Sequence, residues 1–563
     1  MENIAARYTK ADTDALMELV RREPLFVRHL GHMRQRHDDR GLGFVLGAGV
    51  SEQAGVPLWR ELISRLSCHY GDDGPPSEYT QKGYSATLLA QFIYNRFRNA
   101  ERLRVSPEKG PRLVSIAVKN SWYRHIHESI YRSVGKLDAI KKNHPYLQEL
   151  ANIIYFSPFC LTLNFDDIVD RLAQSIQVDQ TLRQRPNVIW KPPTIDRPNS
   201  CVIYHINGFL PQDKGARRSD SIILTEDSFA DMLASPTPTQ MEYIMSRVVS
   251  NSLLIIGASF EDPSLRNLFY AASKRNSAGF HYALHHDEEI CGDNVDSVER
   301  ADRRALNREM YNVITYFTTK DEISAIVRAL NLPRDRFVEL INELAAEVGE
   351  STTTRYYVVG SVSSGKSSLV ERLRAFRTYE EWAEPPPELM FRDYRSLSEA
   401  EKNEVDDWVL SQLARKNNLM RSPQYGIHVM DRAPLDMFAF SESDQENAQK
   451  AERLRKKLNN HSVQAGQIVL LRAAKEALFE RQLRRGRGPE WLEASAYQED
   501  ALEHQSEILA EIYGSHIPPI DTTSMTPEEV ARDVAEIILF GDFREHDLEG
   551  TRKAVEGGLK LYE

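Results

Sequence analysis

Two glycine-rich loops hold the residue types that proteins use to bind phosphate. The first runs from Gly43 to Ser51 (GFVLGAGVS) and the second from Gly360 to Ser368 (GSVSSGKSS). Each follows a short apolar, β-branched stretch and precedes a helical pattern, as the first βα turn of an α/β domain does. Glycine lets backbone N–H groups approach a pyrophosphate without a Cβ clash, and the helix N-terminus adds a favourable potential. The first loop alone is weak evidence, because many tight turns carry glycine for steric reasons only.

The second loop fits a specific phosphate-binding pattern, the P-loop. Residues 360–367 match G-x-x-x-x-G-K-[ST], between the strand-like RYYVV and the helix-like SLVERLRAF. In this pattern the N–H groups cradle phosphates, Lys366 reaches the β- and γ-phosphates, and Ser367 binds Mg²⁺. The predicted nucleotide-binding residues of this loop are Gly360, Ser363, Ser364, Gly365, Lys366, Ser367 and Ser368.

Charged residues further along the chain suit the same nucleotide. Asp431 and Arg432 follow a strand-like run. An aspartate at a strand end that faces a P-loop is placed to bind Mg²⁺ or to accept a hydroxyl proton. In the basic stretch ERQLRRGRG, we predict that Arg484 and Arg487 bind the nucleotide by closing over its phosphates. The alternative is a surface helix that carries arginines without such a role.

Polar side chains follow three strand-like runs in the first half of the chain. The segments are Thr162–Asp167 (TLNFDD), Tyr204–Pro211 (YHINGFLP) and Gly257–Arg266 (GASFEDPSLR). In open α/β sheets, ligands bind beyond the carboxyl ends of the strands. Together with the first glycine loop, these segments predict one shared site rather than four unrelated loops.

Each of these side chains also has a purely structural interpretation. Asn164 and Asp166 lie on the same side of one strand end, and His205 and Asn207 share a face of another. Asn164 alone could cap a turn, and His205 could be a hydrogen-bonded core histidine. Asp262 could cap the helix that follows it.

The elements that must position these residues form an α/β pattern. Strand-like runs alternate with helical segments, as right-handed βαβ crossovers require. The runs are Phe159–Leu163, Val202–His205, Leu253–Ile256, Val313–Phe317, Tyr356–Val359, Gly426–Met430, Ile468–Leu471 and one ending near Ile520. The polar stretch GESTTTR indicates a linker near residue 350. We therefore predict a first domain over residues 1–350, with a helical insertion at about 70–150, and a second over 351–563.

The composition is that of a globular protein with more than one domain. The chain has 563 residues, a formal net charge of −11 and 41% hydrophobic residues. Nucleic-acid binding is not expected, because it would need a local basic patch. The chain lacks an apolar run of membrane-spanning length and the apolar core of a signal peptide, so we expect a cytoplasmic protein that binds no membrane. The four cysteines form no CxxC pair, which argues against a disulfide scaffold or a structural zinc site.

The order of the motifs in the first half resembles the sirtuin-like fold. GAGVS and GVP, then TLNFD, HxNG and GxSFxDPxLR, follow one another over roughly residues 30–320. Asn143-His144-Pro145 and Ala90-Gln91 are further supporting pieces. More narrowly, the combination is similar to the sirtuin-like NAD-hydrolysing effectors of bacterial anti-phage defence. The resemblance implies a Rossmann-type α/β domain that binds NAD.

The resemblance also implies roles for individual residues. Asn164 would lie at the nicotinamide ribose and position the attacking water, and Asp166 would support that strand end. The reaction would cleave an N-glycosidic bond through an oxocarbenium-like transition state, for which nicotinamide is a good leaving group. The residues that would bind NAD are Gly47, Ala48, Gly49, Val50 and Ser51 at the pyrophosphate, Gly257, Ser259 and Asp262 at the adenosine side, and Asn207 at a ribose hydroxyl.

Two departures from the family pattern bear on the chemistry. Sirtuin-like enzymes place the catalytic histidine directly before the glycine of an HG pair, and here Asn207 stands at that position. Asparagine cannot act as a general base at neutral pH. His205, two residues earlier, faces the same way on a strand, so either His205 serves as the base or the base is missing; we favour His205. Sirtuin deacetylases carry paired CxxC motifs that this chain lacks, so NAD hydrolysis is favoured over protein deacetylation.

The second half resembles the P-loop nucleoside and nucleotide kinases, such as thymidylate kinase and the deoxynucleoside kinases. The P-loop, Asp431-Arg432, the arginine-rich segment and a late IDTT contribute to this resemblance over about residues 354–540. It implies a P-loop NTPase domain that binds ATP or a deoxynucleotide, with Mg²⁺ held by Ser367 and Asp431. Whether this domain transfers phosphate or only senses a nucleotide stays open.

Together these features predict a two-domain anti-phage effector. The first domain would hydrolyse NAD to ADP-ribose and nicotinamide, and the kinase-like domain would switch it, because an unregulated NADase would kill its host. By family analogy we expect a homo-oligomer, with a phage-derived trigger or a second defence protein as a further partner. One alternative is a nucleotide kinase whose sirtuin-like domain senses NAD or ADP-ribose without cleaving it. Another is a non-enzymatic nucleotide-binding module that recruits a partner.

Overall fold

The computed structural model describes most of the chain and divides it into two compact units. The described residues are 8–67, 83–104, 110–176, 184–191, 200–234, 238–260, 262–287, 297–392, 396–441, 443–484, 499–514 and 518–561. The first unit comprises Met1–Leu16, Arg36–Ala272 and Phe280–Phe337. The second comprises Met17–Gln35, Ser273–Gly279 and Val338–Glu563.

The N-terminal helices contribute to the second unit, although the sequence analysis assigned residues 1–350 to the first domain. These helices are α2 (Lys10–Arg22) and α3 (Phe26–Asp38). Within the second unit, Nη1 of the buried Arg28 donates to the carbonyl oxygens of Ile538 (3.1 Å) and Gly541 (2.8 Å). These partners lie at least 510 positions away in the sequence, so local pattern could not indicate the contact.

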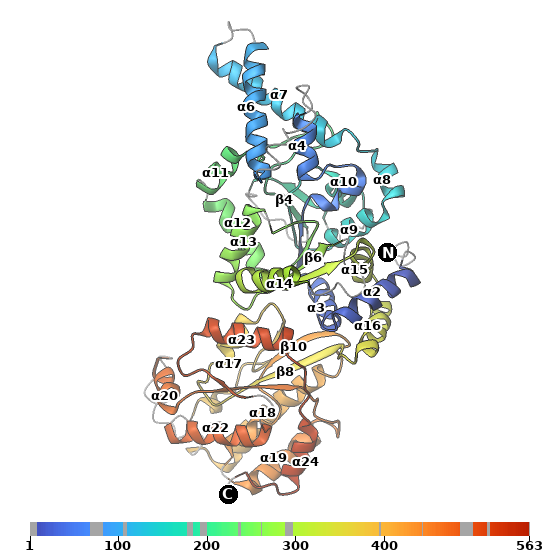
Figure 1. The fold of residues 1–563 in the computed structure, drawn as a ribbon. Coiled ribbons are helices and arrows are strands. Elements are labelled where there is room, and N and C mark those ends of the chain that lie inside the picture. Colours follow the sequence, from blue (N-terminus) through green and yellow to red (C-terminus); the bar gives the residue numbers. More distant parts are fainter. Residues whose placement is uncertain are drawn as a thin grey trace. The chain divides into compact units, whose positions relative to one another are not determined.

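A parallel sheet forms the centre of the first unit, and Figure 1 labels two of its strands, β4 and β6. The sheet has seven strands in the order β3-β4-β2-β1-β5-β6-β7. The strands are β1 (Leu42–Leu46), β2 (Phe159–Thr162), β3 (Asn187–Ile189), β4 (Val202–His205), β5 (Ser252–Ile256), β6 (His281–His286) and β7 (Val313–Thr318). Every residue of β1 is buried, as expected for an apolar strand covered on both faces of a parallel sheet. The predicted α/β fold with parallel sheets is confirmed, but the sequence analysis missed β3 and β6.

Helices cover this sheet, and several lie between β1 and β2, where the sequence analysis expected a helical insertion. They are α4 (Trp59–Ser67), α6 (Ala86–Arg104), α7 (Pro111–Tyr131), α8 (Leu137–Asn143), α9 (Pro145–Tyr155), α10 (Ile168–Gln174), α11 (Glu226–Ala234), α12 (Pro238–Ser250), α14 (Val298–Tyr311) and α15 (Lys320–Leu330). Two more, α13 (Pro263–Arg275) and α16 (Arg334–Val348), contribute residues to both units. In the insertion, α6 and α7 pack along each other through Phe97 and Trp122, whose ring centroids lie 5.0 Å apart.

Two loops meet backbone to backbone where β1 and β5 end. Gly47 N donates to Ile256 O (3.0 Å), and Gly49 N donates to Gly257 O (3.1 Å). A Cβ atom at Gly47 would lie 2.2 Å from Gly257 O, and one at Gly257 would lie 2.6 Å from Val50 N. Gly257 also has a φ of +66°, which side chains other than glycine rarely adopt. The glycines of both loops are therefore required by close packing, whatever ligand the loops bind.

A second parallel sheet, of five strands in the order β12-β11-β8-β10-β9, forms the second unit. Its strands are β8 (Thr353–Val359), β9 (Arg377–Tyr379), β10 (Gly426–Asp431), β11 (Gln467–Arg472) and β12 (Ile520–Asp521). Its helices are α17 (Lys366–Arg372), α18 (Glu399–Leu419), α19 (Asp444–Lys457), α20 (Lys475–Arg484), α22 (Glu499–Tyr513), α23 (Pro527–Phe540) and α24 (Leu548–Glu556). The P-loop joins the central strand β8 to α17. Among the described residues, no helix has the length and apolar character needed to cross a membrane.

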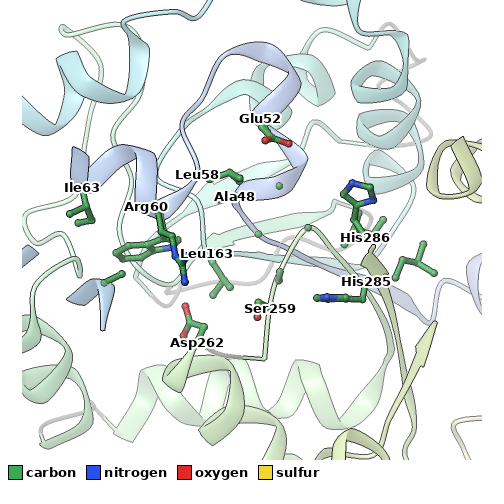
Figure 2. A pocket seen from close by; sticks show the side chains of 18 of the residues that line it. Ala48, Glu52, Leu58, Arg60, Ile63, Leu163, Ser259, Asp262, His285 and His286 are labelled. Atoms are coloured by element: carbon green, nitrogen blue, oxygen red, sulfur yellow. The ribbon is translucent and has the colours of Figure 1, made fainter. Parts of the chain in front are cut away.

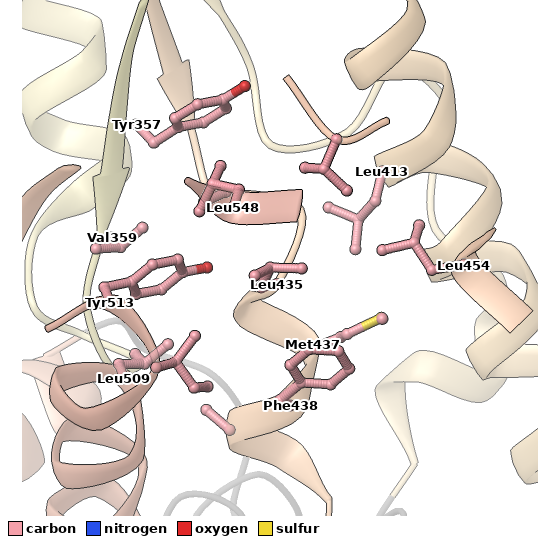
Figure 3. Packing of buried hydrophobic residues seen from close by; sticks show 14 of the residues in the cluster. Tyr357, Val359, Leu413, Leu435, Met437, Phe438, Leu454, Leu509, Tyr513 and Leu548 are labelled. Carbon is pink, nitrogen blue, oxygen red and sulfur yellow. The ribbon is translucent and has the colours of Figure 1, made fainter. Parts of the chain in front are cut away.

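One hydrophobic cluster packs the centre of the second unit (Figure 3). It joins Tyr357 and Val359 of β8 to Leu435, which follows β10, and to Tyr513 of α22. The hydroxyl of the buried Tyr513 donates to Oδ1 of Asp436 at 2.5 Å. This bond links the apolar core to the charged residues that follow β10.

The packing of the two glycine loops predicts the effect of one methyl group. Gly47→Ala is expected to lower the free energy of unfolding by about 2 kcal/mol or more, because the added Cβ would meet rigid backbone. Thermal unfolding would measure the loss. Gly135→Ala is the matched control, since Gly135 is exposed and the nearest atom to an added Cβ is Ala139 Cβ at 3.9 Å. Equal melting temperatures for the two variants would contradict this account of the loops.

Candidate functional site

A cavity of about 860 Å³ opens at the carboxyl ends of β1, β5 and β6 in the first unit (Figure 2). Its walls come from the first glycine loop, the start of α4, the loop after β5, the end of β6 and the start of α15. Among the lining residues are Gly47, Ala48, Gly49, Glu52, Trp59, Arg60, Gly257, Ala258, Ser259, Asp262, His285, His286 and Lys320. Pockets of this size and position are typical of small-molecule sites in open α/β folds.

Two backbone N–H groups in the cavity wall are available to an anion. Ala48 and Ala258 both line the cavity, and neither backbone N–H has a hydrogen-bond partner among the described residues. The N–H groups of Gly47 and Gly49 are instead used inside the two loops. An anionic ligand oxygen would satisfy the remaining donors, as phosphates do at βα turns.

Arg60 and Asp262 point toward one another in the cavity (Figure 2). Oδ1 of Asp262 accepts from the backbone N–H groups of Ser264 (2.8 Å) and Leu265 (3.3 Å), so Asp262 caps α13 as well as lining the cavity. Burial raises the pKa of its carboxyl group above the ordinary value. Arg60 supplies the cavity with a guanidinium that can bind a phosphate.

A much smaller cavity, of about 30 Å³, adjoins the large one. Ala48, Trp59 and Leu163 line both. Asn164 and Asp166 are the polar residues that line the small cavity. Asn164 Nδ2 also donates to Gly47 O at 3.0 Å, so the asparagine is tied directly to the first glycine loop.

Asp166 presents one oxygen without a partner. Its Oδ1 accepts from Ser51 Oγ (3.2 Å) and from the backbone N–H of Ile168 (3.1 Å). Its Oδ2 is buried and has no hydrogen-bond partner among the described residues. Burial is the main cause that raises the pKa of Asp166 to about 6, so the carboxylate is mostly ionised at neutral pH.

His205, favoured above as the base, is fully engaged in the protein interior. Nδ1 lies 2.9 Å from the carbonyl oxygen of Asn164, and Nε2 lies 3.1 Å from Oδ1 of Asp170. Since both partners accept, both ring nitrogens donate, which describes an imidazolium. Burial by itself would lower the pKa of His205, but the Asp170 carboxylate and the two hydrogen bonds together raise it. His205 is 1% exposed and lines neither cavity, so this geometry suits a residue that holds the Asn164 backbone rather than a base.

Asn207 lies behind the same strand end. It is wholly buried, and its Nδ2 donates to the carbonyl oxygen of Leu163 at 3.2 Å. Like His205, Asn207 lines neither cavity. His205 and Asn207 of the HxNG motif therefore both lie outside the lining of the two cavities.

Of the other predicted residues of the first unit, some line the large cavity and the others are buried next to it. Val50 is buried beneath the loop, and Ser51 holds Asp166. The predicted residues that line the large cavity are Gly47, Ala48, Gly49, Gly257, Ser259 and Asp262. The sequence analysis missed Trp59, Arg60, His285, His286 and Lys320. Arg60 could have been found, because it stands three residues after the GVP motif, whereas His285 and His286 end a strand that the sequence analysis did not predict.

In the second unit, the P-loop lysine folds back on its own loop. Lys366 Nζ donates to the carbonyl oxygens of Gly360 (2.8 Å) and Ser361 (2.9 Å). Burial, with a smaller contribution from the Arg432 charge, lowers the pKa of Lys366 to about 8. Gly365, with a φ of +102°, precedes the first residue of α17, and Ser363 and Ser364 are buried in the loop. Ser367 and Ser368 are exposed in the first turn of that helix.

Charged side chains gather at the end of β10. Asp431 is 2% exposed, and its Oδ1 has no partner among the described residues. Arg432 forms an ion pair with Glu381 (2.5 Å), and Lys416 Nζ donates to the backbone carbonyl oxygens of Asp431 and Glu381. Buried cations beside an unpartnered carboxylate suit a site for Mg²⁺ and phosphate.

The two arginines that were predicted to close over the phosphates are Arg484 and Arg487. Arg484 is an exposed residue of α20 that pairs with Glu480 at 2.6 Å, which fits the interpretation as a surface helix. Arg487 lies outside the described residues.

Comparison with known proteins bears on the first unit. A family described as "SIR2-like domain" matches residues 158–314, which include Asn164, His205 and Gly257. The chain therefore contains a SIR2-like domain. The sirtuin-like interpretation is confirmed to that extent. No curated protein matches the chain.

The solved structures that are remotely similar to the chain include the following two. One is a deoxyadenosine kinase from M. mycoides with the products dCMP and dCDP, which is 15% identical, with a TM-score of 0.25, over 32% of this chain and 96% of the other. The other is the NadR protein in complex with NAD and AMP-PNP, which is 12% identical, with a TM-score of 0.25, over 61% of this chain and 79% of the other.

The buried carboxylate of Asp166 predicts a pH-dependent stability difference. Because its folded pKa is raised, the folded state holds this proton more tightly, and the wild type loses stability as pH rises through about 6. Asp166→Asn keeps an acceptor for Ser51 and Ile168 and removes the ionisation. The variant should gain about 1 kcal/mol relative to wild type between pH 5 and pH 7.5. Thermal unfolding across this range tests it, with the exposed Asp302→Asn as control; a constant difference would contradict the buried ionisation.

Lys366 predicts proton uptake when a nucleotide binds to the second unit. With a pKa of about 8, the free lysine is partly neutral at pH 8.5, and a phosphate beside it would restore the charge. Calorimetry with ATP and Mg²⁺ in two buffers of different ionisation enthalpy should therefore show uptake of up to one proton. Lys366→Met should weaken binding and remove the buffer dependence. Binding without any proton uptake in the wild type would count against this role for Lys366.

Proposed function

We propose that the SIR2-like unit hydrolyses NAD to ADP-ribose and nicotinamide, under the control of a nucleotide bound by the P-loop unit. The observation that best supports cleavage is the position of Asn164. Its amide is tied to the glycine loop at Gly47, while the side chain lines the small cavity that continues from the large one. One residue thus connects the first glycine loop to the small cavity.

The large cavity suits a dinucleotide. The pyrophosphate would bind the N–H groups of Ala48 and Ala258 and the guanidinium of Arg60. The adenosine would extend along Ser259 toward the end of β6, and the nicotinamide ribose would approach Leu163 and Asn164. In this pose the glycosidic bond lies where the two cavities join.

Cleavage of the glycosidic bond in NAD needs few catalytic groups, because nicotinamide is a good leaving group. Nicotinamide leaves as a neutral molecule once the glycosidic bond breaks, and an oxocarbenium-like ribose remains. A nearby carboxylate stabilises that positive charge, and Asp166 supplies one. Asn164 would orient the ribose and the attacking water through its amide.

The second unit would bind ATP or a deoxynucleotide together with Mg²⁺. Lys366 and the loop N–H groups would take the phosphates, and Ser367 and Asp431 would hold the metal. The unpartnered Oδ1 of Asp431 favours this assignment, because a buried carboxylate oxygen gains most from a cation. By analogy with the family, we propose a homo-oligomeric defence effector that a phage-derived signal activates through this unit.

A second candidate function is a nucleotide kinase with a first unit that binds NAD or ADP-ribose without cleaving it. The observation that favours it is the engagement of His205 on both ring nitrogens, which leaves the motif histidine unable to act as a base. In that case the reaction would be phosphate transfer at Lys366 and Asp431. The two candidates predict different products from the same mixture of NAD and nucleotides.

The deciding experiment is to follow NAD and its products with purified protein, with and without ATP, Mg²⁺ and a panel of deoxynucleotides. The expected result is nucleotide-dependent formation of ADP-ribose and nicotinamide. Asn164→Ala should lower the rate about 100-fold, since a positioned hydrogen-bonding group is removed from the reacting centre. Asn120→Ala, on the exposed face of α7, is the matched control and should keep the wild-type rate.

Lys366→Ala should remove the nucleotide dependence, and the exposed Lys456→Ala should preserve it. If NAD persists under every condition while a deoxynucleotide gains phosphate, the kinase candidate replaces the proposed function.

A further inference from the structure

We propose that Asp166 is the general base that activates the attacking water, which it holds with Asn164 in the small cavity beside the glycine loop. This inference rests on the proposed NAD hydrolysis. It moves the base from the histidine of the HxNG motif to a carboxylate on the neighbouring strand end.

The size of the small cavity suits water rather than a larger group. A volume of about 30 Å³ holds roughly one or two water molecules and excludes a nicotinamide ring. An ordered water needs polar partners, and here Asp166 and Asn164 supply them. The remaining walls are largely apolar and come from Ala48, Val56, Pro57, Trp59, Leu62, Ile130, Leu163 and Phe165.

The carboxylate of Asp166 is held in one orientation. Ser51 and the Ile168 backbone both donate to Oδ1, which leaves Oδ2 buried and without a partner among the described residues. A buried carboxylate oxygen without a hydrogen bond is costly, and Asp166 lines the small cavity, which points to an unseen donor there. A water molecule that donates to Oδ2 meets this need and is at once placed for deprotonation.

The other candidate bases near this strand end are excluded by their contacts. His205 donates from both ring nitrogens and lines neither cavity. Asn164 and Asn207 carry amides, which do not accept a proton at neutral pH. Within the described part of the chain, Asp166 is the titratable residue that lines the small cavity.

In the proposed hydrolysis, one bond to ribose C1′ breaks, one bond to C1′ forms, and one proton moves to Asp166. The bond between ribose C1′ and the nicotinamide nitrogen breaks, and its electron pair neutralises the pyridinium. The water oxygen forms a bond to C1′, and one water proton passes to Oδ2 of Asp166. The products are ADP-ribose and nicotinamide, and the proton then leaves Asp166 for solvent.

The surroundings of Asp166 also suit a base that works near neutral pH. Burial and the carboxylates of Asp167 and Asp170 raise its pKa to about 6, while the Ile168 N–H and His205 oppose the shift. The value of kcat/KM should therefore rise with pH, with a midpoint near 6, and level off about one pH unit higher, since the base form is the carboxylate.

The test combines two substitutions with a nucleophile that needs no base. Asp166→Asn should lower the turnover number by about 10²- to 10⁴-fold and remove the rise with pH. Binding of ADP-ribose, measured by calorimetry, should persist and shows that the variant is folded. In Asp166→Ala, added azide should attack C1′ directly and restore cleavage at least tenfold, with azido-ADP-ribose as the product by mass spectrometry. Azide should not restore Asn164→Ala.

His205→Gln separates positioning from proton transfer. If His205 only holds the Asn164 carbonyl, this variant should slow turnover by less than Asp166→Asn does and keep the wild-type pH midpoint. The proposal is overturned if Asp166→Asn stays within threefold of wild type. It is also overturned if azide fails to restore an Asp166→Ala variant that still binds ADP-ribose. Either result, obtained with an active wild type, leaves NAD hydrolysis standing, whereas an inactive wild type removes the proposed function itself.

Discussion

The close contact between two glycine loops is the constraint on which the rest of the SIR2-like unit depends. β1 and β5 are neighbours in the sheet, and the loops at their carboxyl ends touch through backbone atoms alone at Gly47, Gly49 and Gly257. No side chain fits between them. This brings the N–H groups of Ala48 and Ala258 to the wall of one cavity, and it fixes the carbonyl of Gly47 to which Asn164 is bound. One wall of the large cavity and the anchoring of Asn164 thus depend on the same contact.

Electrostatics then distinguishes the residues at the neighbouring strand ends. His205 and Asp170 satisfy each other in the interior, which is how a buried charge is tolerated. Their pair holds the carbonyl of Asn164 from behind. Asp166 is buried too, yet one of its oxygens has no hydrogen-bond partner among the described residues, and the residue lines the water-sized cavity. The two acids of the TLNFDDIVD segment therefore differ in their partners: Asp170 is paired with His205, whereas Asp166 lines a cavity.

In the P-loop unit, buried cations take the place that buried acids have in the first unit. Lys366 and Lys416 are buried cations whose pKa values burial lowers to about 8, and both donate to backbone carbonyl oxygens of the strand ends and the segments that follow. Arg432 is balanced by Glu381, while Asp431 keeps an unpartnered oxygen. Such a cluster is poised to bind phosphate and a divalent cation, since these would add the missing partners. Proton movements on nucleotide binding follow from the same burial.

Local sequence pattern was enough to predict the α/β class, the two glycine loops and the strand ends that carry Asn164, Asp166 and Asp262. These features depend on apolar periodicity and turn residues, which involve only neighbours along the chain. It did not reveal that α3 packs on residues near Ile538, or that Arg60 and the end of β6 share a cavity with Gly47. Nor could spacing tell which polar residue of the HxNG and TLNFDD motifs faces the ligand. His205 and Asp166 are both polar residues at strand ends, and only the tertiary structure decides that one is enclosed by two acceptors while the other borders an open space. The reason is that burial and hydrogen-bond partners come from segments distant in sequence, which local spacing does not encode.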